Sequence, residues 1–142
     1  MKRFTAVVLA LTLVLICSVC AVSAAAGGEF APMSSPTIKS TSASSYTGDN
    51  TGEVDFDYMV TVTGTATEVG VSSIVIHKPD GSTETITGTK ANGLVGSGLG
   101  HGGTYTYKGI SGKYYYADVT LFATIGSTTD SRTITTKSAQ AR

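Results

Sequence analysis

Cysteine is nearly absent from this chain of 142 residues, and its two cysteines, Cys17 and Cys20, both lie in one apolar run near the N-terminus. The rest of the chain therefore has no thiol and no disulfide, and its stability must come from packing. Tryptophan is missing altogether. Any aromatic binding surface must then be built from tyrosine and phenylalanine.

Charge is also scarce, because only 14% of the residues are charged and the ten basic residues balance the ten acidic ones. If Lys2 and Arg3 leave with an export signal, the remaining net charge is 8 − 10 = −2. The eight remaining basic residues are scattered singly from Lys39 to Arg142. Nucleic-acid binding needs clustered Lys and Arg, so we expect no nucleic-acid partner.

The N-terminus has the pattern of an export signal. Lys2 and Arg3 precede an apolar run over residues 6–22, which ends in the mainly small residues of Ala21-Val22-Ser23-Ala24. This order of charge, apolar run and small-residue exit is typical of a cleaved signal peptide. We expect cleavage near Ala24, which would leave 142 − 24 = 118 residues. The expected product is secreted and extracellular.

The apolar run has two alternative fates. It approaches the roughly 20 residues that span a bilayer, so an uncleaved segment would anchor the chain in a membrane. The small-residue exit and the polar sequence that follows favour removal. Ile16 precedes Cys17 and Val19 precedes Cys20, and these large residues disfavour lipid attachment at either cysteine.

Several segments have the alternation or turn residues of β-structure. Residues 53–63 alternate, with Val54, Phe56, Tyr58, Val60 and Val62 on one face, which predicts a strand with one buried face. Residues 71–77 and 83–87 flank Pro79-Asp80-Gly81 and predict a hairpin.

The C-terminal half adds further expected strands and one expected loop. Residues 88–103 contain seven glycines, which predicts a long loop with room for one short strand. Strands are expected over residues 104–108 and 114–124, and around residues 133–135 after a polar turn at 126–132. The inward face of the strand over 114–124 is expected to consist of Tyr115, Ala117, Val119, Leu121 and Ala123. No helix of useful length is expected after the signal.

About seven short strands with frequent turns predict an all-β chain, a single antiparallel β-sandwich. The expected organisation is a signal peptide at 1–24, a flexible lead at 25–45 with an edge strand near residues 37–44, a sandwich domain at 46–137 and a tail at 138–142.

The segment Gly112-Lys113-Tyr114-Tyr115-Tyr116-Ala117-Asp118-Val119 resembles the penultimate strand of Ig-like and fibronectin-type domains. There a tyrosine precedes a buried small residue by two positions, as Tyr115 precedes Ala117. The resemblance implies a tyrosine corner, with the Tyr115 hydroxyl bonded to backbone near residues 109–111. The cysteine pair and core tryptophan of antibody domains are absent, so the likeness is to the Ig-like architecture alone.

Residues 53–136 also resemble an uncharacterised family of small secreted bacterial proteins. The resemblance is carried by Val60-Thr61-Val62-Thr63-Gly64-Thr65-Ala66, Val69-Gly70, His101, Gly112 to Thr120 and Asp130-Ser131-Arg132-Thr133. It implies export and the fold, and it transfers no functional residues.

Candidate ligand-binding residues are those of the glycine-rich segment and the tyrosines that strand alternation places near the surface. They are Leu94, Leu99, His101, Tyr105, Tyr107, Tyr114 and Tyr116. Exposed tyrosine suits sugar stacking or a protein partner, because a rigid ring buries much area at little entropic cost. Cross-strand aromatic packing is the competing structural explanation.

The sequence has no pattern for catalysis, a metal or a cofactor. Neither His77 nor His101 has the spacing of a zinc ligand, and a backbone hydrogen bond is the simpler role for His101. Ser97 lies between glycines without the following helix of a nucleophile elbow. Asp55 and Asp57 share a solvent-facing side, where cross-strand pairing with Lys or Arg is the ordinary expectation.

A calcium loop is also not indicated. The turn Asp49-Asn50-Thr51-Gly52-Glu53 lacks the alternating acidic pattern of such loops, and ordinary turn chemistry explains it. The expected function is therefore a non-enzymatic extracellular binding module for a glycan, a cell wall or a protein. One alternative is self-assembly through edge strands, because residues 133–136 have no charged side chain to prevent edge pairing. The other alternative is a small hydrolase or toxin.

Overall fold

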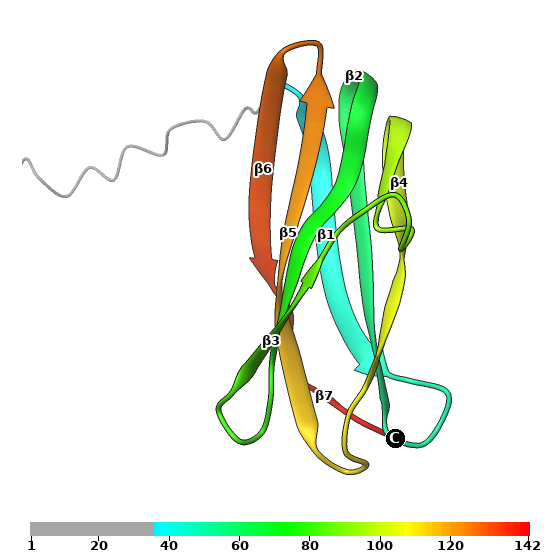
Figure 1. Cartoon of the computed structure of the whole chain (residues 1–142), viewed down its shortest axis with the longest axis vertical. Coiled ribbons are helices and arrows are strands. Elements are labelled where there is room, and N and C mark those ends of the chain that lie inside the picture. The colour runs from blue at the N-terminus through cyan, green and yellow to red at the C-terminus, as the bar shows by residue number, and fades with distance from the viewer. Residues whose placement is uncertain (1–35) are drawn as a thin grey trace, which may run out of the picture. The chain divides into compact units, whose positions relative to one another are not determined.

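The structure is a computed structural model in which residues 36–142 are described. This part of the chain is all-β, a curled antiparallel sheet of seven strands without a helix (Figure 1). The strands are β1 (Ile38–Thr47), β2 (Glu53–His77), β3 (Thr83–Thr87), β4 (Val95–Lys108), β5 (Tyr114–Ile125), β6 (Thr128–Thr135) and β7 (Ala139–Gln140). The predicted signal, residues 1–24, and the first part of the predicted lead lie outside the described residues. Over the described range, no helix is long and apolar enough to span a membrane.

Strand β2 is 25 residues long and belongs to both halves of the curled sheet. Its first half, up to Val62, pairs with β1 along one edge and with β4 along the other. Its second half, from Glu68, pairs with β5 along one edge, and along the other edge it pairs with β4 up to Gly70 and with β3 from Ser73. We predicted two separate strands here, which was wrong, because the chain curves through register shifts between Thr61 and Val69 without leaving the sheet.

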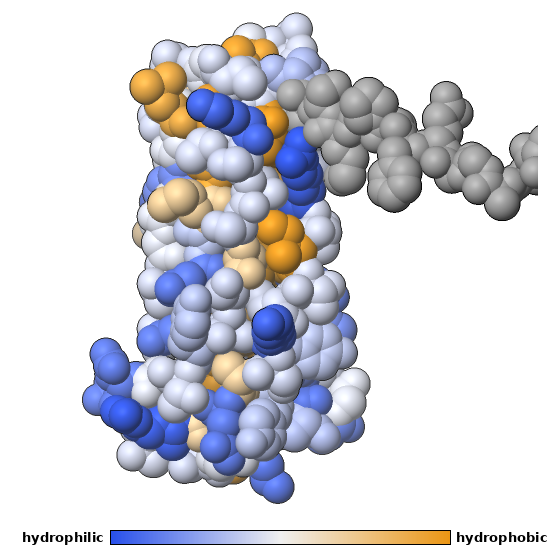
Figure 2. All heavy atoms as spheres, turned by 180° about the vertical axis from the view of Figure 1, so that it is seen from behind, coloured by the Kyte–Doolittle hydropathy of each residue, from blue (hydrophilic) through white to orange (hydrophobic). Residues whose placement is uncertain are grey.

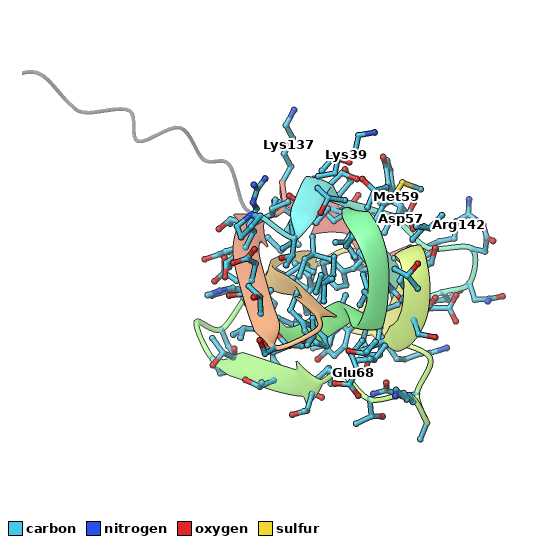
Figure 3. The ribbon with its side chains drawn as sticks, turned by 90° about the horizontal axis from the view of Figure 1, so that it is seen from above. Lys39, Asp57, Met59, Glu68, Lys137 and Arg142 are labelled. Carbon is cyan, nitrogen blue, oxygen red and sulfur yellow. The ribbon has the colours of Figure 1, made fainter. Side chains whose placement is uncertain are left out.

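The core lies inside the curl, where the predicted faces of β2 and β5 meet (Figure 3). The five residues predicted inward on β2 and the five on β5 are all buried, together with Val69, Val71, Ile74 and Ile76. Fully burying one such aliphatic side chain contributes roughly 1.5–3 kcal/mol. The buried faces predicted for these two strands are thus confirmed.

The glycine-rich segment is a correction to the sequence analysis. We predicted a long loop over residues 88–103, whereas β4 begins at Val95 and continues to Lys108. Glycine is required because backbones approach closely: a Cβ on Gly88 would lie 1.7 Å from the Val71 carbonyl oxygen, and one on Gly100 would lie 2.7 Å from that of Val60. Residues 88–94 do form a loop between β3 and β4, whereas from Val95 onward the glycines reflect close strand packing.

The two outer strands β1 and β6 run side by side in the same direction (Figure 1) and are joined by side chains. The hydroxyl and the backbone N–H of Thr37 donate to the carboxylate of Asp130, and the Ser45 hydroxyl donates to the Lys137 carbonyl oxygen. Strand β6 begins at Thr128, so the predicted polar turn over 126–132 is mostly strand. These contacts hold the curled sheet closed.

The C-terminal residues are part of the sheet and not a loose tail. Strand β7 pairs with the start of β5, and Ala139 and Ala141 are buried. The backbone N–H of Arg142 donates to the Glu53 carbonyl oxygen at 3.2 Å. The predicted domain boundaries at 46 and 137 therefore move outward to β1 and β7.

Candidate binding site

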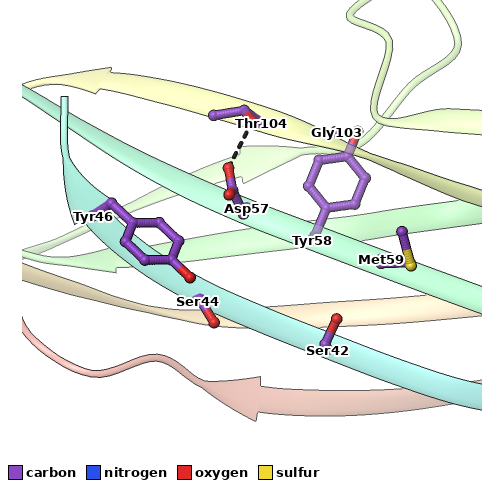
Figure 4. Close-up of a pocket in the computed structure, with 8 residues that line it drawn as sticks. All are labelled: Ser42, Ser44, Tyr46, Asp57, Tyr58, Met59, Gly103 and Thr104. Atoms are coloured by element: carbon purple, nitrogen blue, oxygen red, sulfur yellow. Dashed lines mark hydrogen bonds between the residues drawn. The ribbon is translucent and has the colours of Figure 1, made fainter. Parts of the chain in front are cut away.

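The outer face of the sheet formed by β1, the first half of β2 and β4 carries a shallow trough of about 400 Å³ (Figure 4). Because side chains alternate along a strand, the residues of β2 that alternate with the buried Phe56, Tyr58 and Val60, such as Asp57 and Met59, point outward here. The trough is lined by Ser42, Ser44 and Tyr46 of β1, Asp57, Tyr58 and Met59 of β2, and Gly103 and Thr104 of β4. We call this set the trough.

The register places the polar and apolar groups of the trough in cross-strand rows. Ser44 lies opposite Asp57, and Asp57 lies opposite Thr104. The Thr104 hydroxyl donates to Asp57 Oδ1 at 2.6 Å. Among the described residues, Asp57 Oδ2 and the Ser44 hydroxyl make no hydrogen bond, so both are available to a ligand.

Tyr46 and Met59 supply the apolar surface of the trough. Each is 55% exposed, although burial would be favourable for side chains of this size. No Lys or Arg lines the trough. Its chemistry is one exposed aromatic ring and one thioether beside hydroxyl and carboxylate oxygens.

A second hollow of about 370 Å³ lies on the other side of Tyr46. It is lined by Ala43, Ser44, Ser45, Tyr46, Thr135 and Lys137, so it runs between β1 and the end of β6. Ser44 and Tyr46 line both hollows. The Tyr46 ring therefore stands between two adjoining depressions.

Sequence reasoning missed Tyr46, because the expected edge strand ended near residue 44, whereas β1 continues to Thr47. The signal was present in the alternation Ser40-x-Ser42-x-Ser44-x-Tyr46, which puts three hydroxyls and a tyrosine on one side of a strand. The cross-strand partners of Asp55 and Asp57 were also predicted incorrectly. They are the hydroxyls of Thr106 and Thr104, each at 2.6 Å, and not Lys or Arg.

None of the candidates in the glycine-rich segment lines the trough. Leu94 is only 2% exposed and packs in the core, so it cannot contact a ligand at the surface. Leu99 is 70% exposed on β4. His101 Nε2 donates to the Gly93 carbonyl oxygen at 2.8 Å, and its ring lies 5.9 Å from that of Tyr58. His101 therefore makes the backbone hydrogen bond that the sequence analysis gave as the alternative to ligand binding.

Tyr105 and Tyr107 share one face of β4, as predicted, and both pack half-buried against the core. The Tyr107 hydroxyl donates to Glu84 Oε2 at 3.2 Å, which lowers the pKa of that carboxyl after the larger effect of Lys78. Burial raises the pKa of both tyrosines. Both rings pack against the core, and the centroid of the Tyr107 ring lies 5.5 Å from that of Tyr115, which agrees with the packing explanation considered for them.

Tyr114 and Tyr116 point outward from β5, on the half of the sheet that does not hold the trough. The Tyr116 ring stacks on His77 with centroids 4.2 Å apart. His77 Nε2 lies 2.8 Å from Asp118 Oδ2, and the Thr135 hydroxyl donates to Asp118 Oδ1 at 2.6 Å. The Thr135 bond, followed by that of His77, lowers the pKa of Asp118.

The predicted tyrosine corner is present. Tyr115 is 2% exposed, and its hydroxyl accepts a hydrogen bond from the backbone N–H of Ile110 at 2.8 Å. This partner lies within the predicted range of residues 109–111. The ring also closes against Gly109, where a Cβ would lie 2.5 Å from Tyr115 Cζ.

Within residues 36–142 no group of three or more His, Cys, Asp or Glu side chains is placed to hold a metal ion. The residues that the structure brings together are those of the trough, with Tyr46 at its boundary with the second hollow. Comparison of the chain with protein-family models, with curated proteins and with solved structures found no match.

Proposed function

We propose that this chain is an exported, non-enzymatic Ig-like β-sandwich that binds an uncharged polysaccharide outside the cell through the trough. The single observation that carries the proposal is the position of Tyr46, an exposed ring between two adjoining hollows lined by hydroxyl groups. A sugar ring has an apolar face and a rim of hydroxyls, which suits an aromatic side chain beside hydrogen-bonding oxygens.

The shape and charge of the site support an extended neutral ligand. Sites for small molecules are usually concave and enclose most of the ligand, whereas here two hollows adjoin and share Ser44 and Tyr46 in their lining. The surface seen from behind has mostly intermediate hydropathy, with small separate apolar and charged patches (Figure 2). A polymer that lies across both hollows would gain contacts that a single sugar could not.

The Ig-like assignment rests on the tyrosine corner and on antiparallel strands around one core. Export rests on the signal pattern that ends near Ala24. Of the two alternatives, self-assembly is favoured by one specific observation, the unpaired outer edge of β4 among the described strands.

The test is a binding isotherm with insoluble polysaccharides, in which the depletion of free protein is measured. The wild-type chain is compared with Tyr46→Ala and with Tyr114→Ala on chitin, β-glucan, peptidoglycan and mucin, and on matrix proteins as the protein arm. Tyr114 is a matched control because it is 58% exposed, close to the value for Tyr46, and lies outside the trough.

We expect saturable retention on one polysaccharide, weakened about tenfold or more by Tyr46→Ala, which corresponds to about 1.4 kcal/mol. Tyr114→Ala should bind like the wild type. If both variants lose the same amount of affinity for the polysaccharide, the trough is not the binding site. Retention by matrix proteins alone would replace the glycan by a protein ligand.

A further inference from the structure

The curled sheet has five strands with an outer edge, and four of these edges are covered or short, that of β7 being only two residues long. Strands β1 and β6 lie against each other through the Thr37 to Asp130 and Ser45 to Lys137 contacts. Strand β3 has five residues, with the Lys78 to Glu84 ion pair at 2.9 Å beside it. Strand β4 is 14 residues long and, among the described strands, pairs only with β2.

The outer edge of β4 lacks the residues that usually protect an exposed strand. From Val95 to Tyr107 there is no Asp, Glu, Lys, Arg or Pro, whereas protein edges are commonly blocked by charge, proline or a bulge. Residues 100–108 pair one-to-one with residues 61–53 of β2, without a register shift. Up to Tyr107 this regular stretch carries no charged side chain, and β4 is the outermost strand on its side of the sheet in Figure 1.

The hydrogen-bond pattern shows which backbone groups this edge offers. The N–H of Gly109 donates to the carbonyl oxygen of Gly52 at 2.7 Å, and these two residues follow directly from the paired Lys108 and Glu53. In an antiparallel ladder, bonded and non-bonded pairs alternate. Within residues 100–107, the residues whose N–H and C=O groups point away from β2 are therefore Gly100, Gly102, Thr104 and Thr106.

We propose that the outer edge of β4 pairs with β4 of a second copy of this chain, antiparallel and centred on Gly103. An antiparallel pair has a two-fold axis, so the same four outward-pointing residues of each copy meet and satisfy one another. In this register Gly100 faces the partner's Thr106, and no two like charges lie opposite. Leu99, which is 70% exposed, comes to lie opposite the partner's Tyr107.

A second copy fits this edge better than an open-ended stack of copies. Pairing across a two-fold axis occupies the outer edge of β4 in both molecules. In each molecule the outer edges of β1 and β6 are covered by their contacts with each other, so they do not pair with a third copy. The assembly therefore closes at two copies. One pair of strands buries less area than a standard protein interface, so the dimer is weak and forms at high micromolar concentrations or above.

The test compares Thr106→Pro with Thr106→Val by sedimentation equilibrium of the exported chain, from about 10 µM to about 1 mM. Both variants lose the hydroxyl that donates to Asp55. Only proline also removes the outward N–H, a change that an edge strand tolerates. We expect the wild type and Thr106→Val to dimerise at the upper concentrations and Thr106→Pro to stay monomeric.

Leu99→Lys is the second variant, because Leu99 is exposed and a lysine on an edge strand opposes pairing with another edge. We expect it to be monomeric over the same range, and it decides the matter if Thr106→Pro fails to fold by circular dichroism. A wild-type monomer at the highest concentration overturns the proposal. So does dimerisation that survives both variants, or growth to species larger than two copies.

Discussion

Replacing Tyr115 by Phe removes one oxygen atom from the core and leaves the aromatic ring in place. The lost group is the acceptor for the Ile110 N–H, at 2.8 Å. A net protein hydrogen bond contributes about 0.5–1.5 kcal/mol, and a donor left without a partner costs about 1–3 kcal/mol. Because this bond is only partly buried, water can reach the N–H in part, and we expect a loss of about 1–2 kcal/mol.

Urea denaturation followed by circular dichroism measures this loss. For a two-state domain with a slope of about 1.5 kcal/mol per molar urea, a loss of about 1.5 kcal/mol lowers the midpoint by about 1 M. Tyr114→Phe is the matched control, since it is the same chemical change at the neighbouring, exposed residue. We expect the free energy of unfolding of Tyr114→Phe to lie within about 0.5 kcal/mol of the wild-type value.

The reasoning would be refuted by a Tyr115→Phe midpoint that equals that of Tyr114→Phe. Such a result would mean that the corner hydroxyl makes no net contribution, and that ring packing alone holds the end of the sheet. A loss well above about 3 kcal/mol would also disagree, because one neutral hydrogen bond cannot account for it.

Two further predictions concern the same end of the sheet and its pH dependence. Gly109→Ala should lower the free energy of unfolding by about 1–3 kcal/mol, because its Cβ would lie 2.5 Å from Tyr115 Cζ. The control is Gly64→Ala, whose Cβ would have its nearest atom at 3.8 Å and which should lower the free energy of unfolding by less than about 0.5 kcal/mol. Thermal melts in which Gly64→Ala is the less stable variant would contradict the packing argument. Asp118 has a pKa below the ordinary aspartate value of 3.8, so its stabilising effect is present above that value and is lost as the pH falls through the lower folded-state pKa. Between about pH 5 and pH 2, the urea midpoint of the wild type should therefore fall more steeply than that of Asp118→Asn, and parallel curves would show that this carboxylate does not contribute.

Strand alternation predicted the parts of the fold in which a face is uniformly apolar. The inward residues of β5 and of the first half of β2 follow a period of two, and all are buried. Pro79-Asp80-Gly81 predicted the hairpin between β2 and β3, and the N–H of Gly81 donates to the Lys78 carbonyl oxygen at 3.0 Å. These elements depend on local pattern and turn chemistry, which a sequence displays directly.

The remaining features depend on contacts between distant segments. Glycines such as Gly96 and Gly100 have no side-chain pattern, so the first part of β4 resembled a loop, and only the close approach of neighbouring groups explains their presence. Tyr46 gained its position from the register of β1 on β2, which places Asp55 opposite it. The trough was therefore missed, although Asp57, which lines it, was one of the residues considered.

Strand β2 also has a consequence for how the protein folds and unfolds. Its residues pair with strands that come both before and after it in the sequence, from Ile38 in β1 to Thr124 in β5. A continuous strand with partners so far apart gives a high contact order, which slows folding because long chain loops must close before the pairing is gained. Neither half of the sheet can detach without taking part of β2 from its other partners. The two halves are thus expected to gain and lose structure together, as one cooperative unit.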